Sequence, residues 1–191
     1  MNPKDAKDDG APPRAGASGP TGRTEASDSI AIRPAGPDDV ALILQLIREL
    51  AAYERLLGEV EVTETALRKT LFPAGGAPPS AHVLIGEMGS APAGFAVYIF
   101  NYSTFLGKPG IYLEDLFVRP GSRGKGLGTA LLLHLVALAR ERACGRMEWA
   151  VLNWNQPAID FYKRLGAVPL EEWTVFRLTG AALQGPAPRR R

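Results

Sequence analysis

The chain has 191 residues, of which 46% are hydrophobic and 22% charged, and its net charge is +2. This balance is typical of a soluble globular protein with one domain of ordinary size, and it gives no sign of a general nucleic-acid-binding surface. The single cysteine, Cys144, excludes an intrachain disulfide and a cysteine-based metal cluster. No apolar run reaches the roughly 18 residues of a membrane-spanning helix, and the N-terminal segment lacks the apolar centre of a secretory signal. We therefore expect a cytoplasmic protein without membrane association.

Both ends of the chain differ in composition from its middle. Residues 1–28 contain no Val, Ile, Leu, Phe, Tyr or Trp, so they cannot bury enough apolar surface to offset the entropy lost on ordering. The other end finishes in three consecutive arginines. The composition predicts a disordered tail over 1–28, a folded domain over 29–180 and a short basic tail over 181–191.

Hydrophobic periodicity and turn residues predict an alternation of strands and helices. An apolar stripe at three- and four-residue spacing predicts a helix over 37–54. Thr63 is expected to cap a second helix that ends near Leu71. Asn155 and Gly166 are expected to begin and end a later helix. The other expected elements are a helix over 127–142, a loop over 101–110, and strands over 29–33, 81–88, 93–100, 111–118, 146–152 and 175–178.

A strand-turn-helix stretch over 111–132 carries the most informative loop. Its turn reads Arg-Gly-Lys-Gly-Leu-Gly over 123–128 and leads into a leucine-rich helix. Glycines at a helix start let unpaired backbone N–H groups approach an anion, and the arginine and lysine add positive charge. The spacing fits neither a P-loop nor the GxGxxG dinucleotide fingerprint. The turn is therefore either another kind of phosphate-binding loop or a glycine-rich turn that binds nothing.

Four segments together resemble one known family. They are Ile32-Arg33-Pro34-Ala35, Leu113-Glu114-Asp115, the loop over 123–128 and the run Trp154-Asn155-Gln156-Pro157-Ala158-Ile159-Asp160-Phe161-Tyr162-Lys163. They resemble the GNAT N-acetyltransferases, in particular the spermidine/spermine and thialysine branch, over about residues 30–178. The resemblance implies an α/β GNAT fold, with a mixed, mostly antiparallel sheet of six to seven strands and about four helices. It also implies acetyl-CoA as cosubstrate, a small amine as substrate, no metal and a homodimer.

In this family, acetyl-CoA lies between the splayed ends of two parallel strands. The resemblance implies contacts to the acetyl and pantetheine part from the end of strand 111–118 and from the start of helix 155–165, and a pyrophosphate site in the glycine loop. The implied cofactor-binding residues are Leu116, Phe117, Val118, Arg123, Gly124, Lys125, Gly126, Leu127, Gly128, Thr129, Asn155, Gln156, Pro157 and Ala158.

Tyr162 takes the position of the family's general acid, close to the sulfur of CoA. Attack of a neutral amine on a thioester requires that the departing thiolate be protonated or stabilised. A phenol can supply that proton only if it is held against the sulfur. The alternative is an ordinary amphipathic-helix tyrosine that packs beside Phe161.

Glu114 and Asp115 interrupt an otherwise apolar strand. Because strand side chains alternate, we expect the two carboxylates on opposite faces of the sheet, with at least one of them buried. A buried carboxylate costs several kcal/mol unless it has a partner, and a cationic amine is such a partner. The resemblance implies that Glu114 accepts the amine's proton through water and that Asp115 contacts the acceptor. The alternative is a structural pair bridged to Arg or Lys.

Further acceptor-binding residues are expected at Tyr53, Glu54, Ser103, Phe105, Glu148, Trp149 and Glu172. Glu54 is either an acidic contact for a cationic acceptor or a solvated residue at a helix end. Polyamine-specific members carry an acidic residue and a tryptophan where this chain has Ser103 and Phe105. A missing carboxylate weakens the hold on a distant ammonium group. We therefore expect thialysine-like or short diamine acceptors ahead of spermidine. A protein lysine or N-terminal acceptor, and a non-catalytic acyl-CoA-binding regulatory module, are the alternatives.

Overall fold

The computed structural model describes residues 29–185, so the predicted tail over 1–28 and residues 186–191 lie outside the described residues. The described chain forms two compact units, of which the first ends at Glu148 and the second begins at Trp149. The first unit contains a β-sheet and three α-helices, and the second contains two short helices. The single domain over 29–180 stays a prediction.

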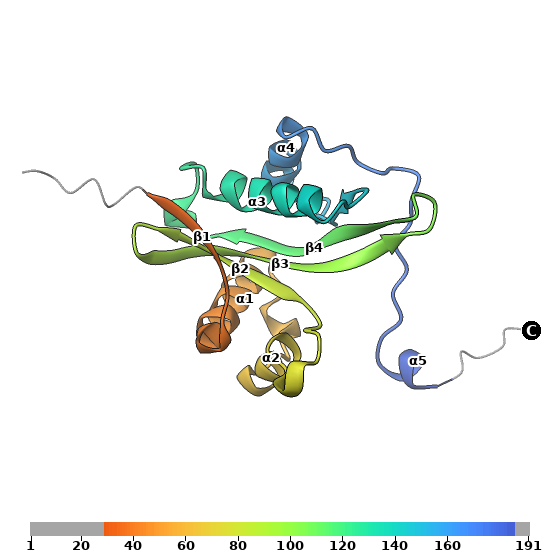
Figure 1. Ribbon diagram of the computed structural model, residues 1–191, viewed down its shortest axis with the longest axis horizontal. Coiled ribbons are helices and arrows are strands. Elements are labelled where there is room, and N and C mark those ends of the chain that lie inside the picture. Colours follow the sequence, from red (N-terminus) through yellow and green to blue (C-terminus); the bar gives the residue numbers. More distant parts are fainter. Residues whose placement is uncertain (1–28, 186–191) are drawn as a thin grey trace, which may run out of the picture. The chain divides into compact units, whose positions relative to one another are not determined.

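A five-stranded sheet forms the centre of the first unit (Figure 1). Its strands lie side by side in chain order: β1 (Ile30–Pro34), β2 (His82–Met88), β3 (Ala91–Ser103), β4 (Lys108–Val118) and β5 (Met147–Glu148). Strands β1 to β4 pair antiparallel, whereas β5 pairs parallel to β4. The predicted mixed, mostly antiparallel α/β class is confirmed, but the described residues form five strands and not six or seven.

Helices cover both faces of this sheet (Figure 1). The helices α1 (Val40–Glu54) and α2 (Glu64–Leu71) lie on one face, and α3 (Leu127–Glu141) lies on the other. The predicted cap of α2 is confirmed, because Oγ1 of Thr63 accepts a hydrogen bond from the Ala66 N–H at 3.2 Å. The absence of a side chain at Gly86 lets α3 approach the sheet, since a Cβ there would lie 2.9 Å from Cδ1 of Leu127.

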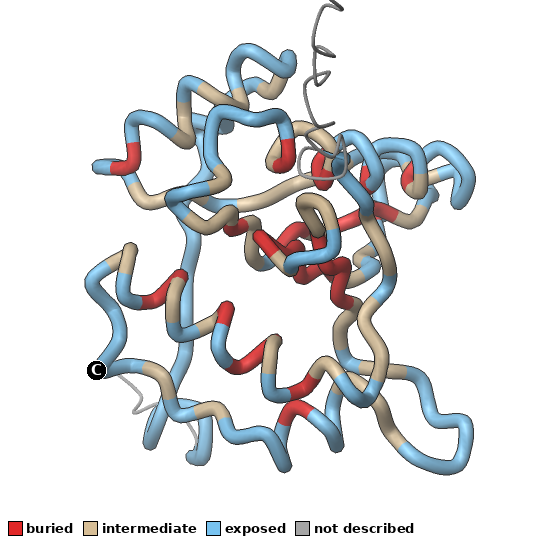
Figure 2. The backbone as a smooth tube through the Cα atoms, turned by 90° about the vertical axis from the view of Figure 1, so that its left-hand side faces the viewer, coloured by how far each residue is buried: buried red, intermediate tan, exposed pale blue. Residues whose placement is uncertain are grey.

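The main core lies between α1, α2 and the sheet. The predicted apolar stripe of the first helix faces it, and Figure 2 shows buried residues recurring at intervals along helical segments. The buried members of this core are Val40, Ile43, Leu44, Leu46, Leu50, Leu67, Val83, Ile85, Phe95, Val97 and Phe117. The core therefore fixes the inner face of α1 against β2, β3 and β4.

The long hairpin of β3 and β4 contains a register shift. Val97 pairs with Asp115, but the next residue of β3, Tyr98, pairs with Leu113, so Glu114 has no residue opposite it. A bulge of this kind interrupts the alternation of side chains between the two faces of a sheet. The prediction that Glu114 and Asp115 face opposite sides assumed strict alternation, and the bulge removes that basis at this pair.

The second unit contains α4 (Gln156–Arg164) and the short α5 (Ala181–Gln184). The predicted N-cap of α4 is confirmed, because Oδ1 of Asn155 accepts a hydrogen bond from the Ala158 N–H at 3.4 Å. Gly166 follows the helix end with φ +87°, a left-handed conformation that favours glycine. Neither unit contains, within residues 29–185, a helix long and apolar enough to cross a membrane.

Three predicted segments differ in the structure. The loop over 101–110 is mostly strand, because β3 continues to Ser103 and β4 begins at Lys108. The strand over 146–152 is reduced to β5, because its ladder with β4 contains only the pairs at Ile111 and Tyr112. The strand over 175–178 is not formed, because these residues pair with no strand of the described chain. Side chains that favour β structure do not make a strand without a neighbouring strand to pack and pair with.

Candidate functional site

The glycine loop joins the end of β4 to the start of α3. Gly124 and Gly126 have φ of +74° and +92°, so the loop requires glycine for its backbone conformation. A Cβ on Gly126 would meet only Cδ1 of Ile30, at 3.6 Å, so space is not the constraint in the free protein. Gly126 is the N-cap of α3 and provides no side-chain cap. The first N–H groups of α3, from Leu127 to Thr129, thus remain donors suited to an anion such as a pyrophosphate.

The edge of β4 next to this loop is open. The ladder between β4 and β5 ends at the pair Tyr112 and Glu148, although β4 continues to Val118. Along residues 113–118, no described strand pairs with β4 on that side. Successive residues of a strand direct their backbone groups to opposite edges, so Leu116 and Val118 face this open edge while Phe117 pairs with Phe95 of β3. The groups at the open edge are available to an extended ligand, except the Val118 carbonyl, which accepts a hydrogen bond from Arg123.

Arg123 begins the loop but points back to the sheet. Its Nε donates a hydrogen bond to the Val118 carbonyl at 2.9 Å. The guanidinium carbon lies 4.5 Å from the centre of the Tyr53 ring and 5.7 Å from that of Phe117. In the free protein, the Arg123 side chain is thus held against aromatic rings of the α1 side, while Lys125 is exposed.

Three carboxylates gather where α1 ends beside β4. Asp115 lies opposite the core residue Val97 and therefore shares the α1 face of the sheet. Burial, and then the charges of Glu114 and Glu54, together raise the pKa of Asp115 to about 6. Burial also raises the pKa of Glu54, the last residue of α1. No ion pair to these three carboxylates is found within residues 29–185.

Two other predicted acceptor carboxylates lie in different settings. Glu148 of β5 accepts an ion pair from Nε of Arg146 at 2.8 Å, and Nδ2 of Asn101 lies 3.4 Å from the same oxygen. Its charge is therefore already balanced by protein groups. Glu172 belongs to the second unit and is exposed in a segment without helix or strand. Within residues 29–185, no group of three or more His, Cys, Asp or Glu is arranged so that it could hold a metal ion.

Ser103 and Phe105 lie at the tip of the hairpin of β3 and β4, at the opposite end of β4 from the glycine loop (Figure 1). Ser103 is buried, and its Oγ accepts a hydrogen bond from the Leu106 N–H at 3.3 Å, so its hydroxyl stabilises the turn. Phe105 is 95% exposed. The structure therefore does not bring these two residues together with the carboxylates at Glu54 and Asp115.

The remaining predicted residues belong to the second unit. Tyr162 of α4 has aromatic neighbours on two sides: its ring centre lies 5.0 Å from that of Trp149 and 5.2 Å from that of Phe161. Gln156 and Pro157 form the first turn of α4, where Nε2 of Gln156 donates to Asp160 at 2.7 Å. The rings restrict the orientation of the Tyr162 phenol, as both a catalytic and a packing role require.

Sequence reasoning missed the contacts that connect β4 to α1. Arg119, at the end of β4, donates from Nε and Nη2 to the two carboxylate oxygens of Glu49, each at 2.8 Å. The stacking of Arg123 on Tyr53 and the bulge at Glu114 were also not predicted. These partners are distant in sequence or depend on strand register, so no local pattern of residue types reveals them.

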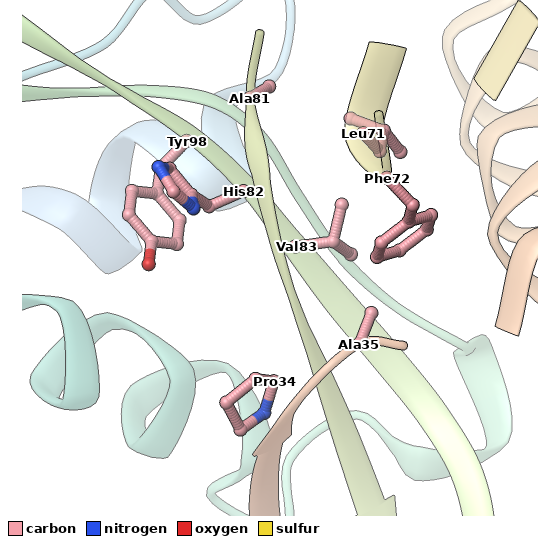
Figure 3. A pocket seen from close by; sticks show the side chains of 8 residues that line it. All are labelled: Pro34, Ala35, Leu71, Phe72, Ala81, His82, Val83 and Tyr98. Atoms are coloured by element: carbon pink, nitrogen blue, oxygen red, sulfur yellow. The ribbon is translucent and has the colours of Figure 1, made fainter. Parts of the chain in front are cut away.

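A small hollow lies away from all of these groups (Figure 3). His82 stacks on Tyr98 at one side of it, with 5.2 Å between ring centres, and burial followed by the charge of Arg142 lowers the pKa of His82. Its lining is otherwise mostly apolar, and consists of Pro34, Ala35, Leu71, Phe72, Ala81, His82, Val83 and Tyr98. Because no predicted site residue lines it, the candidate site remains the region of β4 and the glycine loop.

Known proteins are similar to this chain over most of its length. Residues 44–167 match the Acetyltransferase (GNAT) family. Thialysine N-epsilon-acetyltransferase from Bos taurus is 41% identical over 166 residues, which cover 81% of this chain and 95% of the relative. An L-ornithine N5-acetyltransferase from Arabidopsis thaliana is 34% identical, with coverage of 80% and 86%. Spermidine/spermine N(1)-acetyltransferase-like protein 1 from Homo sapiens is 36% identical over 81% of this chain, but only 23% of that protein is covered.

Solved structures share the fold. An integron cassette protein from V. cholerae has a TM-score of 0.68 and 26% identity, and the match covers 82% of this chain and 96% of that one. An aminoglycoside acetyltransferase from a soil metagenomic sample has a TM-score of 0.66 at 19% identity, with coverage of 78% and 95%. At that identity the second likeness concerns the fold alone.

Proposed function

Because this chain belongs to the GNAT acetyltransferase family, we propose that it transfers an acetyl group from acetyl-CoA to a primary amine of a small diamine, polyamine or lysine-like acceptor. The observation that carries the proposal is the arrangement along β4. The carboxylates around Asp115 lie next to the open strand edge over 116–118, and that edge leads into the glycine loop. A thioester held at the open edge and an amine held at the carboxylates meet on one strand.

The acetyl donor binds along the end of β4 and across the loop. Of the strand end at Leu116, Phe117 and Val118, the backbone groups that face the open edge pair with the amide groups of the pantetheine arm. The first N–H groups of α3, from Leu127 to Thr129, receive the pyrophosphate, with Lys125 adding positive charge. In the second unit, the capped first turn of α4 at Asn155 to Ala158 contributes the remaining pantetheine contacts.

The acceptor binds as a cation and reacts as a neutral amine. Glu54, Glu114 and Asp115 attract the ammonium form, since their negative charges are unbalanced by protein cations within the described residues. Glu114 then removes one proton through water, so that the nitrogen lone pair can attack the thioester carbon. Burial and the like charges of Glu114 and Glu54 disfavour the ionised form of Asp115 and so raise its pKa. A bound cation would favour the ionised form again.

Tyr162 completes the reaction as the general acid. As the C–S bond breaks, the departing thiolate takes the phenolic proton. The attacking nitrogen loses its second proton, which returns to the tyrosinate through solvent, and the acetyl group remains on the nitrogen as an amide. The rings of Trp149 and Phe161 hold the phenol in one orientation. We further infer a cytoplasmic homodimer from the family resemblance, and a monomer mass by light scattering of the full chain would contradict the dimer.

The experiment that tests the function is CoA-thiol release by the purified chain with acetyl-CoA and a panel of amines. The panel contains thialysine, lysine, ornithine, 1,3-diaminopropane, putrescine, spermidine and spermine. We expect turnover, with thialysine or the short diamines ahead of spermidine. Binding of acetyl-CoA with no thiol release across the panel contradicts the proposal, and directs the search to protein amines or to a regulatory module.

Tyr162→Phe tests the chemical step separately. Loss of the phenolic proton should lower kcat by roughly two to four orders of magnitude, the range for acid–base groups, while the Kd of acetyl-CoA changes little. Tyr102→Phe, at an exposed tyrosine of the β3 end, is the matched control and should leave kcat unchanged. An equal loss of acetyl-CoA binding in Tyr162→Phe would make the tyrosine a structural residue.

A further inference from the structure

We propose that Arg123 is a positioning residue that couples the acceptor side of the protein to the acetyl-CoA loop through the ring of Tyr53. The proposal rests on the proposed function, because it concerns the two sides of that site. It assigns Arg123 a different task from a direct pyrophosphate contact. The contacts that carry it all lie in the first unit.

Arg123 joins three elements at one point. It belongs to the loop before α3, and its Nε donates a hydrogen bond to the carbonyl of Val118, the last residue of β4. Its guanidinium lies over the ring of Tyr53, near the end of α1. The Val118 bond fixes the direction of the guanidinium, and the Tyr53 ring supplies a cation–π contact within the usual 6 Å. The side chain therefore ties the loop to both neighbouring elements.

The surface under the guanidinium is rigid. Tyr53 is half-buried and packs against the main core, and Phe117, the second ring near Arg123, is a buried member of that core. Because the Tyr53 ring is packed against the core, it restricts the position of the Arg123 guanidinium. By contrast, the loop itself is exposed from Arg123 to Gly126 and has two glycines in left-handed conformations. The loop thus gains its order from the arginine contact more than from packing of its own.

Tyr53 is also a neighbour of the acceptor cluster. The next residue, Glu54, is the last residue of α1 and belongs to the proposed acceptor cluster. A change at the end of α1 is transmitted to the loop through the Tyr53 ring. Because a loop held in its binding conformation binds more tightly than a mobile one, the ring contact raises the affinity for acetyl-CoA.

The test is the Kd of acetyl-CoA, measured by titration calorimetry on the full chain with no acceptor present. Tyr53→Leu removes the aromatic face, and we expect the Kd to rise about two- to fivefold, the range for an exposed cation–π contact. Tyr53→Phe keeps the face and should stay within about twofold of wild type. A pure acceptor-binding role for Tyr53 predicts no change in this Kd for either variant.

A double-mutant cycle decides whether Arg123 is the partner. In Arg123→Met the ring has no cation, so adding Tyr53→Leu should not weaken binding further. If the two substitutions raise the Kd by independent factors that multiply in the double mutant, the coupling is overturned. A wild-type Kd in Tyr53→Leu overturns it as well. Either result leaves the proposed function in place. Failure of the wild-type chain to bind acetyl-CoA overturns the proposed function and the coupling with it.

If Tyr53→Leu does not fold, hydrogen exchange tests the Arg123 contact without that variant. Backbone amides over 119–126 should exchange faster in Arg123→Met than in wild type, whereas amides of the β2 strand should not change. Arg123→Lys keeps the charge but loses the planar guanidinium, so it should resemble Arg123→Met in this measurement. Unchanged exchange in both variants overturns the proposal.

Discussion

At the N-terminal end of α1, Asp39 receives the Arg33 guanidinium through two hydrogen bonds of 2.7 and 2.8 Å, and the Arg33 bond lowers the pKa of Asp39. At the C-terminal end, Glu54 and Asp115 have raised pKa values, for which burial is the first cause. The helix dipole adds to the contrast, because it favours negative charge at the first end and disfavours it at the second.

We propose that the difference separates carboxylates that stabilise the fold from carboxylates that bind a ligand. Arginines of the protein neutralise the first kind, as Arg33 does for Asp39 and Arg119 does for Glu49. Glu54, Glu114 and Asp115 have no ion pair with a cation of residues 29–185, so a bound cationic ligand would neutralise them. A cluster of this kind destabilises the free protein, which is a recurrent property of binding sites.

The largest effect should follow from removing an unpaired carboxylate. In Asp115→Asn, we expect kcat/KM for the amine acceptor to fall about 10- to 100-fold, because a hydrogen bond to a charged group is worth about 1.5–3 kcal/mol. The acetyl-CoA Kd should not change. Asp39→Asn is the control at the other end of α1, and a similar loss of kcat/KM per folded molecule in both variants would remove the distinction.

Stability should change in opposite directions at the two ends. Urea unfolding at pH 8 should show Asp39→Asn less stable by about 1–2 kcal/mol, since it loses charge-assisted hydrogen bonds to a partly exposed arginine. Asp115→Asn should be more stable by about 1–3 kcal/mol, since it removes a charge whose pKa is raised from 3.8 to about 6. Destabilisation in both variants would contradict the account.

The pH dependence of stability follows from the direction of each shift. For Asp115, the folded state holds its proton more tightly than the unfolded state, so its stabilising contribution is present below pH 3.8 and is lost as the pH rises through about 6. The advantage of Asp115→Asn should therefore disappear near pH 4. For Asp39, whose pKa is lowered, the contribution is present above the ordinary value and is lost as the pH falls below it.

The smallest effect is expected from Glu54→Gln. The charge of Glu54 is the last of the causes that raise the pKa of Asp115, so its removal should lower that pKa slightly. The acid limb of the kcat/KM profile should then move to lower pH, and the plateau near pH 8 should fall by less than in Asp115→Asn. An acid limb that stays in place would show that Glu54 does not act on the reacting cluster.

Local sequence patterns were sufficient to predict the elements that border the site. The caps at Thr63 and Asn155 and the glycine at Gly166 depend on neighbours within a few residues, and each was placed correctly. The loop over 123–128 was also placed between a strand and a helix, although its glycines are required by positive φ more than by close approach.

Features that depend on strand register or on distant partners were not predictable. The bulge at Glu114 arises because Val97 pairs with Asp115 and Tyr98 with Leu113, and it interrupts the side-chain alternation on which the prediction for the two carboxylates depended. The Arg119 and Glu49 pair joins residues that are 70 positions apart. The hydrophobic run over 175–178 looked like a strand because side-chain preference carries no information about whether a neighbouring strand exists.

The most direct measurement is the stabilisation of the protein by an amine acceptor. With CoA present and no acetyl donor, a diamine or thialysine at about one hundred times its Kd should raise the free energy of unfolding of wild type by about 2.7 kcal/mol. Asp39→Asn should gain the same amount, and Asp115→Asn much less. Equal gains in all three proteins would contradict the claim that the carboxylates beside the end of α1 hold the cationic acceptor.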